Sequence, residues 1–274
     1  MVILTERERE IISKKIKGTS LTQNESNILS KYIRPKLREI RKINIDYISN
    51  KIEYNQKARA IENKIKKIAL KNVEKVESIV LYGSAIQTNY KNYKDIDVLI
   101  ITKEKLWSST GEKYQIILDL INRAKKEKLD LDIQITDKKS FYNQYPHNPS
   151  LIYQLEDSKI VYGKLKLSSH LELSKLDLRM KLDWSDIDDE ESNGENIYQS
   201  LRNILLVRLL LNKIVDNAIL NESVKKELGE RLMKRLKDNL ASKLEKRLVL
   251  MYIRKLSKET DRKILEAKWE KIVL

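Results

Sequence analysis

The spacing of apolar residues changes along the chain and divides it into segments of different secondary structure. Over the first 75 residues, and again after residue 165, apolar residues recur every three or four positions, as in amphipathic helices. Between these stretches, short β-branched apolar runs alternate with helical patterns. We therefore predict a basic helical region at 1–45, a connecting helix at 46–75, an α/β (α+β) core at 76–165 and a helical domain at 166–274.

The central segment has the pattern of a small mixed sheet with helices between its strands. The predicted strands cover residues 77–82, 95–102, 130–136 and 160–162, and the predicted helices cover 113–127, 138–145 and 149–155. A further short helix is expected after Gly83-Ser84. Strands that alternate with helices in this way predict one unit in which the helices cover the sheet.

Two capping boxes predict the starts of two short N-terminal helices. Thr5 and Thr22 each precede a glutamate by three residues, a pairing that satisfies free N–H groups at a helix start, and Gly18 fits a helix end between them. A third, basic helix over residues 31–42, which Pro35 starts or kinks, gives a pattern that resembles a helix-turn-helix; a plain helical bundle is the alternative. The residues expected to face a phosphate backbone are Arg34, Lys36, Arg38, Arg41 and Lys42.

Apolar periodicity after residue 165 predicts a helical bundle. Its helices are expected near 195–216, 221–238, 240–256 and 258–271. An acidic stretch at 183–192, which we interpret as a solvated loop, separates these helices from a preceding helical part.

Charge and composition restrict the partners and the chemistry. The 274 residues carry a formal net charge of +15, and the first 75 hold 19 Lys and Arg against 9 Asp and Glu. Such an excess is expected of a region that binds a polyanion, and it is also found on the surfaces of heat-adapted proteins. The chain has no cysteine, which excludes disulfides and thiolate metal sites, and its two histidines, His147 and His170, argue against a zinc site or a His-centred hydrolase.

Membrane and export signals are not expected. The most apolar helical stretch, at 201–211, is interrupted by Arg202, Asn203 and Arg208, and no apolar run reaches the length of about eighteen residues that a membrane span needs. The first residues lack the pattern of a signal peptide. We expect a cytoplasmic protein without a membrane partner.

The residues from 80 to 102 carry the candidate chemistry. An apolar run ends at Gly83-Ser84, and after ten intervening residues the next apolar run begins with Asp95 and Asp97. Positions i and i+2 of a strand face the same side, so the two carboxylates project side by side. Two such charges are unfavourable unless a cation lies between them, and carboxylate oxygens suit Mg²⁺. A strand that ends at Gly-Ser and opens a helix can hold a phosphate on its backbone N–H groups.

This order of apolar strand, Gly-Ser, ten residues and Asp-x-Asp resembles the signature of the DNA polymerase β-like nucleotidyltransferase superfamily, in particular its minimal and antibiotic-type members. The resemblance covers residues 70–165. It implies that Gly83 and Ser84 contact the phosphates of a nucleoside triphosphate and that Asp95 and Asp97 hold two Mg²⁺ ions.

The resemblance also implies a third carboxylate on a neighbouring strand. In the predicted strand at 130–136, Asp130, Asp132 and Gln134 share one face, so parity alone does not choose between the two aspartates. Asp132 is favoured because it lies deeper in the strand, between Leu131 and Ile133.

The chain departs from the family pattern in two places. Many members carry an arginine shortly after Gly-Ser and a serine before the first aspartate, whereas this chain has Ala85-Ile86-Gln87 and Lys94 at these places. Lys91 or Lys94 would then meet the charge of the triphosphate, unless both are only solvated loop residues.

The activity implied by the resemblance is transfer of a nucleoside monophosphate, with AMP from ATP favoured, to a hydroxyl acceptor with release of pyrophosphate. The basic charge favours RNA or DNA as the acceptor, while the minimal family also modifies small antibiotics and protein hydroxyls. The alternative is a non-catalytic nucleic-acid-binding regulator or antitoxin that keeps the transferase fold. A partner protein or a homo-oligomer is compatible with both.

Overall fold

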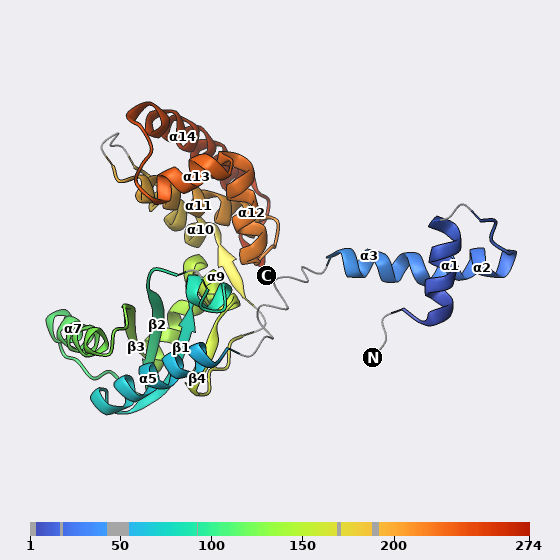
Figure 1. Cartoon of the computed structure of the whole chain (residues 1–274). Coiled ribbons are helices and arrows are strands. Elements are labelled where there is room, and N and C mark those ends of the chain that lie inside the picture. Colours follow the sequence, from blue (N-terminus) through green and yellow to red (C-terminus); the bar gives the residue numbers. More distant parts are fainter. Residues whose placement is uncertain (1–3, 17–18, 43–54, 92, 169–170, 188–191) are drawn as a thin grey trace. The chain divides into compact units, whose positions relative to one another are not determined.

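Figure 1 shows the computed structural model of the chain, which describes residues 4–16, 19–42, 55–91, 93–168, 171–187 and 192–274. The chain forms two compact units, Met1–Tyr54 and Asn55–Leu274. Within the described residues, no helix is both long and apolar enough to cross a membrane.

The N-terminal unit consists of two helical runs. Its elements are α1 (Glu6–Ile16), α2 (Gln23–Ile28), the π-helical segment η1 (Leu29–Ile33) and α3 (Arg34–Lys42). Both predicted capping boxes are confirmed, since the Glu8 carboxylate accepts the Thr5 N–H at 2.9 Å and the Glu25 carboxylate accepts the Thr22 N–H at 2.8 Å. The helices α2 and α3 are joined through η1 without a turn.

The π-helical segment is explained by Pro35. Proline has no N–H to donate, and in a regular α-helix its ring crowds the carbonyl four residues earlier. The helix widens before Pro35, where the Arg34 N–H donates to the Leu29 carbonyl, five residues earlier. Pro35 thus lies in the first turn of α3 as expected, but the second and third predicted helices form one run. The predicted helix-turn-helix is therefore not confirmed.

The basic side chains of α3 have different environments. The Lys36 Nζ lies 2.7 and 3.0 Å from the two carboxylate oxygens of Glu8, so this ammonium joins α3 to α1. Lys36 thus has a carboxylate partner within the unit, and its expected contact with a phosphate backbone stays a prediction. Arg34 and Arg38 are exposed, one helical turn apart. The side chains of Arg41 and Lys42 lie outside the described residues.

The larger unit is built on a four-stranded mixed sheet. The strands are β1 (Val76–Tyr82), β2 (Ile96–Thr102), β3 (Leu131–Asp137) and β4 (Lys159–Gly163), in the order β3-β2-β1-β4. The central strand β1 is antiparallel to β2 and β4, while β2 and β3 are parallel. The predicted α+β class with a small mixed sheet is confirmed, and each strand ends within one residue of its predicted position.

Helices cover both faces of this sheet. They are α5 (Gln56–Asn72), α6 (Gly83–Gln87), α7 (Thr110–Lys126), α8 (Lys138–Gln144), the 3-10 turn η2 (Tyr145–His147) and α9 (Pro149–Glu156). Ile96, Val98 and Ile100 of β2 belong to a buried cluster with α5 and α7. The alternate residues Leu99 and Ile101 belong to a second cluster with α8, α9 and the C-terminal helices. By this alternation, Asp97 projects on the side of α8 and α9.

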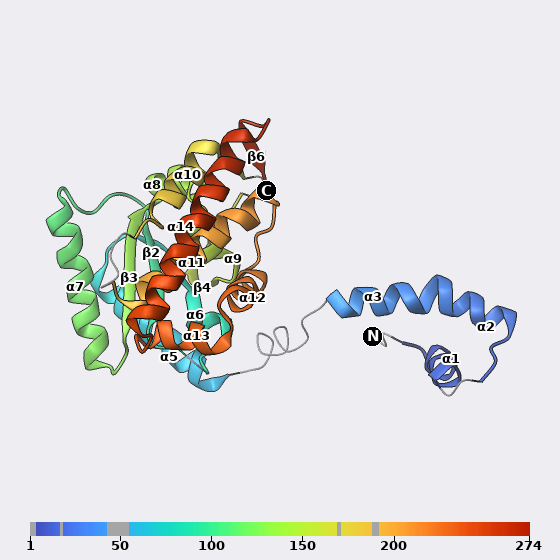
Figure 2. The ribbon, with the colours of Figure 1, turned by 90° about the horizontal axis from the view of Figure 1, so that it is seen from above.

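The C-terminal part is helical, with one small added sheet. Its elements are β5 (Glu172–Ser174), α10 (Lys175–Asp183), α11 (Gly194–Leu211), α12 (Asn217–Leu228), α13 (Glu230–Lys237), α14 (Lys243–Glu266) and β6 (Lys271–Val273). The helix predicted at 221–238 is divided at Gly229, whose φ of +72° is not helical. The two helices predicted at 240–256 and 258–271 are instead one, α14, which lies along α11 (Figures 1 and 2). The antiparallel pair β5 and β6 was not predicted.

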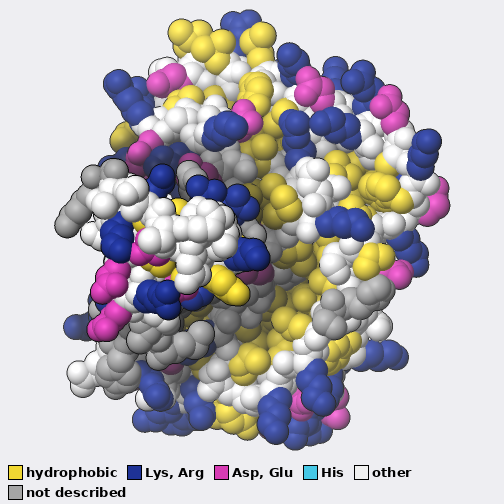
Figure 3. All heavy atoms as spheres, turned by 90° about the vertical axis from the view of Figure 1, so that its right-hand side faces the viewer, with side chains coloured by type: hydrophobic (Ala, Val, Ile, Leu, Met, Phe, Trp, Pro, Cys, Tyr) yellow, Lys and Arg dark blue, Asp and Glu magenta, His cyan; other side chains and the backbone are white. Residues whose placement is uncertain are grey.

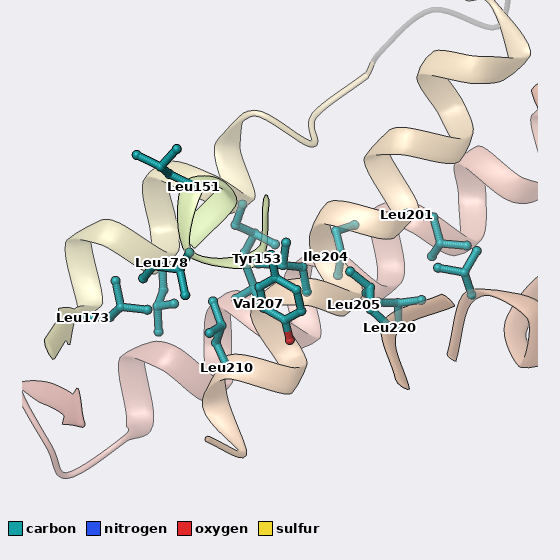
Figure 4. Packing of buried hydrophobic residues seen from close by; sticks show 14 of the residues in the cluster. Leu151, Tyr153, Leu173, Leu178, Leu201, Ile204, Leu205, Val207, Leu210 and Leu220 are labelled. Atoms are coloured by element: carbon teal, nitrogen blue, oxygen red, sulfur yellow. The ribbon is translucent and has the colours of Figure 1, made fainter. Parts of the chain in front are cut away.

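The C-terminal helices share one hydrophobic cluster with the sheet. In Figure 4, Tyr153 of α9 lies among side chains of α11 such as Ile204 and Val207, with Leu178 of α10 and Leu220 of α12 in the same cluster. The cluster extends to Val80 and Leu99 on the strands. Figure 1 accordingly shows α9 between the strands and the C-terminal helices.

Candidate active site

The turn between β1 and α6 approaches the central aspartate of β2 closely. In the antiparallel register, Tyr82 at the end of β1 is paired with Asp97. The next residue, Gly83, has a φ of +72°, and a Cβ added to it would lie 1.9 Å from Oδ2 of Asp97. A side chain at this position would therefore collide with the carboxylate, so the site requires glycine at residue 83.

Two of the predicted aspartates lie side by side on neighbouring parallel strands. Asp97 of β2 is the register partner of Asp132 of β3, and partners in register project on the same face of a sheet. Asp97 is half-buried and Asp132 is exposed. Asp95 lies one residue before β2. Asp130 precedes β3, where its carbonyl accepts the Ile96 N–H at 3.0 Å. This register supports Asp132 as the third carboxylate.

Electrostatics supports the proximity of the three carboxylates. Burial, followed by the neighbouring charges of Asp95 and Asp132, raises the pKa of Asp97 to about 6. Asp130 is not among these causes. The carboxylates thus create a site where negative charge is crowded, and a bound cation would relieve this crowding.

Tyr82 is a member of this site that the sequence did not indicate. Its side chain is 1% exposed, and its hydroxyl has no hydrogen-bond partner among the residues that the structure describes. Burial raises its pKa, and the charges of Asp97 and Asp132 raise it further. The apolar run before Gly83 predicted only a core position here, because the pairing of Tyr82 with Asp97 depends on a strand register that one sequence does not define.

The other predicted ligands of the nucleotide lie at the surface. Ser84 is exposed in the first turn of α6, and Lys94 is exposed directly before Asp95. Tyr90 and Tyr93, in the segment between Ser84 and Asp95, pack edge to face with ring centroids 5.9 Å apart. The Tyr90 hydroxyl donates to Glu62 at 3.2 Å, so this ring is part of the packed interior.

A cleft of about 540 Å³ lies along strand β3, and none of the three aspartates lines it. Gln134, two residues after Asp132 on the same face of β3, lines it together with Gln154 of α9. Trp107 and Lys113 form another part of its wall, with the Lys113 Nζ 5.4 Å from the Trp107 ring centroid. The volume of the cleft lies in the range of small-molecule binding sites.

The described residues contain no group of three or more His, Asp and Glu side chains already placed to hold a metal ion. Asp95, Asp97 and Asp132 would therefore form only part of a coordination shell. An incomplete protein shell fits Mg²⁺, which is commonly held by one or two carboxylates together with substrate phosphates and water.

Comparison with protein families agrees with this geometry. Residues 63–164 match the family described as Polymerase beta, Nucleotidyltransferase. The chain carries a nucleotidyltransferase domain of this type. The matched residues run from α5 to the end of β4 and include all three aspartates, Gly83 and Ser84. Comparison with curated protein sequences gives no match.

Solved structures with nucleotidyltransferase chemistry in their descriptions are similar to parts of this chain. One is a complex of a tri-AMPylated Shewanella oneidensis HEPN toxin with MNT antitoxin, with 23% identity over 39% of this chain and 73% of that chain and a TM-score of 0.27. Another is the spectinomycin adenyltransferase AAD(9) from Enterococcus faecialis with ATP and spectinomycin, with 18% identity over 74% of this chain and 98% of that chain and a TM-score of 0.49. Since both scores are below 0.5, we assign the nucleotidyltransferase domain from the family match and the site geometry.

Proposed function

We propose that the nucleotidyltransferase domain transfers AMP from ATP to a hydroxyl acceptor, with release of pyrophosphate, and that it requires Mg²⁺. The observation that carries this proposal is the register pair of Asp97 and Asp132, with Asp95 next to it and the Gly83 turn against the Asp97 carboxylate. Family membership of the domain supports transfer of a nucleoside monophosphate in general. The identities of the nucleotide, the metal and the acceptor go beyond the family match and belong to our proposal.

The residues that would hold Mg²⁺ are Asp95, Asp97 and Asp132. The crowding that raises the pKa of Asp97 to about 6 supports this assignment, because a divalent cation turns three mutually repelling carboxylates into ligands. When bound, two Mg²⁺ ions would offset the charge of the triphosphate and lower the pKa of the acceptor hydroxyl.

The triphosphate is proposed to lie at the turn that opens α6. Gly83 has no side chain, so a phosphate can approach the backbone, and the first N–H groups of a helix are free to donate to it. Ser84 is exposed in the same turn and Lys94 is exposed beside Asp95, so both can reach a phosphate oxygen. These contacts would orient the α-phosphorus for in-line attack.

The acceptor oxygen would attack from the side of Asp132. This carboxylate is exposed at the cleft side of the sheet, while Asp97 is half-buried under the Gly83 turn. A bond forms between the acceptor oxygen and the α-phosphorus, the bond to the β-phosphate oxygen breaks, and pyrophosphate leaves. Positioning and charge stabilisation by these residues account for the rate, as is usual in transfers of phosphoryl-type groups.

RNA is the first acceptor to test. The chain has a net charge of +15, and on the face drawn in Figure 3 Lys and Arg side chains are spread widely among fewer Asp and Glu side chains. Arg34 and Arg38 of the N-terminal unit are exposed and can contact a phosphate backbone. A protein hydroxyl is the second acceptor to test, in the same reaction.

The deciding experiment is incubation of the full chain with each α-³²P-labelled NTP and Mg²⁺, with total RNA and total protein as acceptors. Asp97→Asn should abolish labelling, and EDTA should do so in the wild type. Asp119→Asn, which changes an exposed aspartate of α7, is the matched control and should label normally. Label that persists in Asp97→Asn would contradict the proposal. Tight DNA binding without label under any condition would favour a non-catalytic regulator.

A further inference from the structure

A second cavity, of about 290 Å³, lies between η2, the start of α9 and helix α10. None of the three aspartates lines it. Its wall includes Met180 and Lys181 from α10, Trp184 directly after this helix, and His147 and Asn148 from the other side. The proposed transfer reaction assigns no role to this cavity.

The most unusual feature of the cavity is the ammonium group of Lys181. This side chain is only 9% exposed, and within the described residues no carboxylate or hydrogen-bond acceptor partners its Nζ. Its Nζ lies 5.8 Å from the centroid of the Trp184 ring. Burial and the nearby charge of Arg202 lower the pKa of Lys181 to about 8. The stem of Lys181 is thus buried while its ammonium, which contacts the Trp184 ring, is placed to meet an anion that enters the cavity.

The carboxylate nearest to this site is already engaged. Asp177, on the cavity wall, accepts hydrogen bonds from the Ser174 N–H at 2.7 Å and from the Ser174 hydroxyl at 2.8 Å. Its Oδ2 also lies 3.5 Å from Nδ1 of His147. Among the described residues, no carboxylate therefore pairs with Lys181 at the cavity wall.

The remaining wall suits a flat apolar group. Trp184 is 70% exposed and Met180 is 50% exposed, although both belong to residue types that normally bury their side chains. At the mouth of a cavity, the indole ring offers a surface for stacking, and the flexible thioether side chain can adapt to the shape of a ligand. The side-chain amide of Asn148 adds a polar group at the opposite wall.

We propose that this cavity binds a small molecule in which a carboxylate or a phosphate is attached to a flat apolar group, with the anion on Lys181 Nζ and the flat group on Trp184. The volume of the cavity is at the lower end of the range for ligand sites, which limits the ligand to a small one. The site is distinct from the three aspartates, so binding requires neither ATP nor transfer activity.

Tryptophan fluorescence reports on this site directly, because the chain has only three tryptophans. In a Trp107→Phe/Trp269→Phe protein, Trp184 is the sole emitter. We expect saturable changes in its emission with benzoate and with phenyl phosphate, and none with benzyl alcohol, which has a similar shape and no charge. The two anions distinguish a carboxylate site from a phosphate site.

Lys181→Met in the same background should weaken anion binding at least tenfold, and Lys181→Arg should retain most of it. Lys237→Met is the matched control, because it removes an exposed lysine that lies 4.5 Å from the Tyr198 ring centroid, outside the cavity. Thermal unfolding followed by circular dichroism verifies that each variant is folded, and Lys181→Met should melt at the same or a higher temperature. Equal binding of benzyl alcohol, or unchanged anion binding in Lys181→Met, would overturn the proposal.

Discussion

The carboxylate of Asp97 occupies the space that a side chain at Gly83 would need, because a Cβ on this glycine would lie 1.9 Å from Oδ2 of the aspartate. The turn at Gly83 and the carboxylate at the start of β2 thus determine each other's position. The nucleotidyltransferase motif is in this respect one packed object, although ten residues separate its two halves in the sequence.

Gly83→Ala should displace the Asp97 carboxylate or the start of α6. Because a shift of about 1 Å in a catalytic group costs on the order of 100-fold in rate, we expect a loss of transfer of at least that size. Gly229→Ala is the control, since Gly229 has the same φ of +72° and a Cβ added to it would have no atom within 4 Å. Both variants carry the cost of a positive φ, and Gly83→Ala should lose more stability in urea unfolding because of the clash. A comparable loss of transfer in both would contradict the steric explanation.

Asp97 should make stability depend on pH in a defined direction. Its folded pKa of about 6 is higher than the reference value of 3.8, so between these values the folded state holds a proton that the unfolded state has released. The free energy of unfolding attributable to Asp97 therefore falls as pH rises from about 4 to about 6. Urea unfolding of the wild type and of Asp97→Asn at pH 4 and pH 7, without metal, measures this difference.

In that comparison, Asp97→Asn should gain stability relative to the wild type at pH 7 and less so at pH 4, because it removes the crowded charge. Addition of Mg²⁺ at pH 7 should stabilise the wild type and have little effect on the variant. An identical pH dependence in both proteins would show that Asp97 has an ordinary pKa.

Asp132 and Asp130 should differ in their importance. Since only Asp132 is in register with Asp97, Asp132→Asn should lower kcat by roughly 100-fold or more, as expected for loss of an acid–base or metal-binding carboxylate. Asp130→Asn should stay near wild type because Asp130 uses its backbone carbonyl in the fold. The reverse order of effects would assign the third carboxylate to Asp130.

Two buried tyrosines should respond in opposite ways to loss of the hydroxyl. Tyr82 and Tyr153 are both 1% exposed, but within the described part of the chain only the Tyr153 hydroxyl has a partner, the Ile214 carbonyl at 2.7 Å. Tyr153→Phe should lower the free energy of unfolding by about 1 kcal/mol, and Tyr82→Phe should leave it unchanged or raise it. If transfer nevertheless falls in Tyr82→Phe, the hydroxyl takes part in the reaction rather than in folding.

Local signals made much of this fold predictable. The Thr22–Glu25 capping box defined a helix start because its hydrogen bonds lie within four residues. The strand at Asp97 was evident because β-branched apolar residues surround the aspartate on both sides. Asp132 was preferred over Asp130 on the same kind of flanking pattern, and its register with Asp97 agrees with that preference.

The predictions that were wrong or missing concern features that depend on contacts between residues distant in the sequence, or that neighbouring residues could provide equally well. Pro35 is compatible with the start of a new helix or with a continuous helix that widens before it. The hydrogen bond from the Arg34 N–H to the Leu29 carbonyl shows that the helix is continuous and widened. Lys36 was indistinguishable from its basic neighbours until α3 placed it next to Glu8. The strand pair β5 and β6 joins residues about 100 positions apart, so neither short apolar stretch could be recognised alone.

The cluster that Tyr153 and Leu99 share with Ile204 and Val207 has a consequence for any attempt to shorten the protein. A fragment ending after β4 would retain every carboxylate of the motif and yet expose to water the apolar side chains that α9 turns toward the last helices. We expect such a fragment to aggregate, and we expect the strands and the C-terminal helices of the intact chain to melt in a single cooperative transition. The C-terminal helices thus contribute to the hydrophobic core that supports the strands carrying the aspartates.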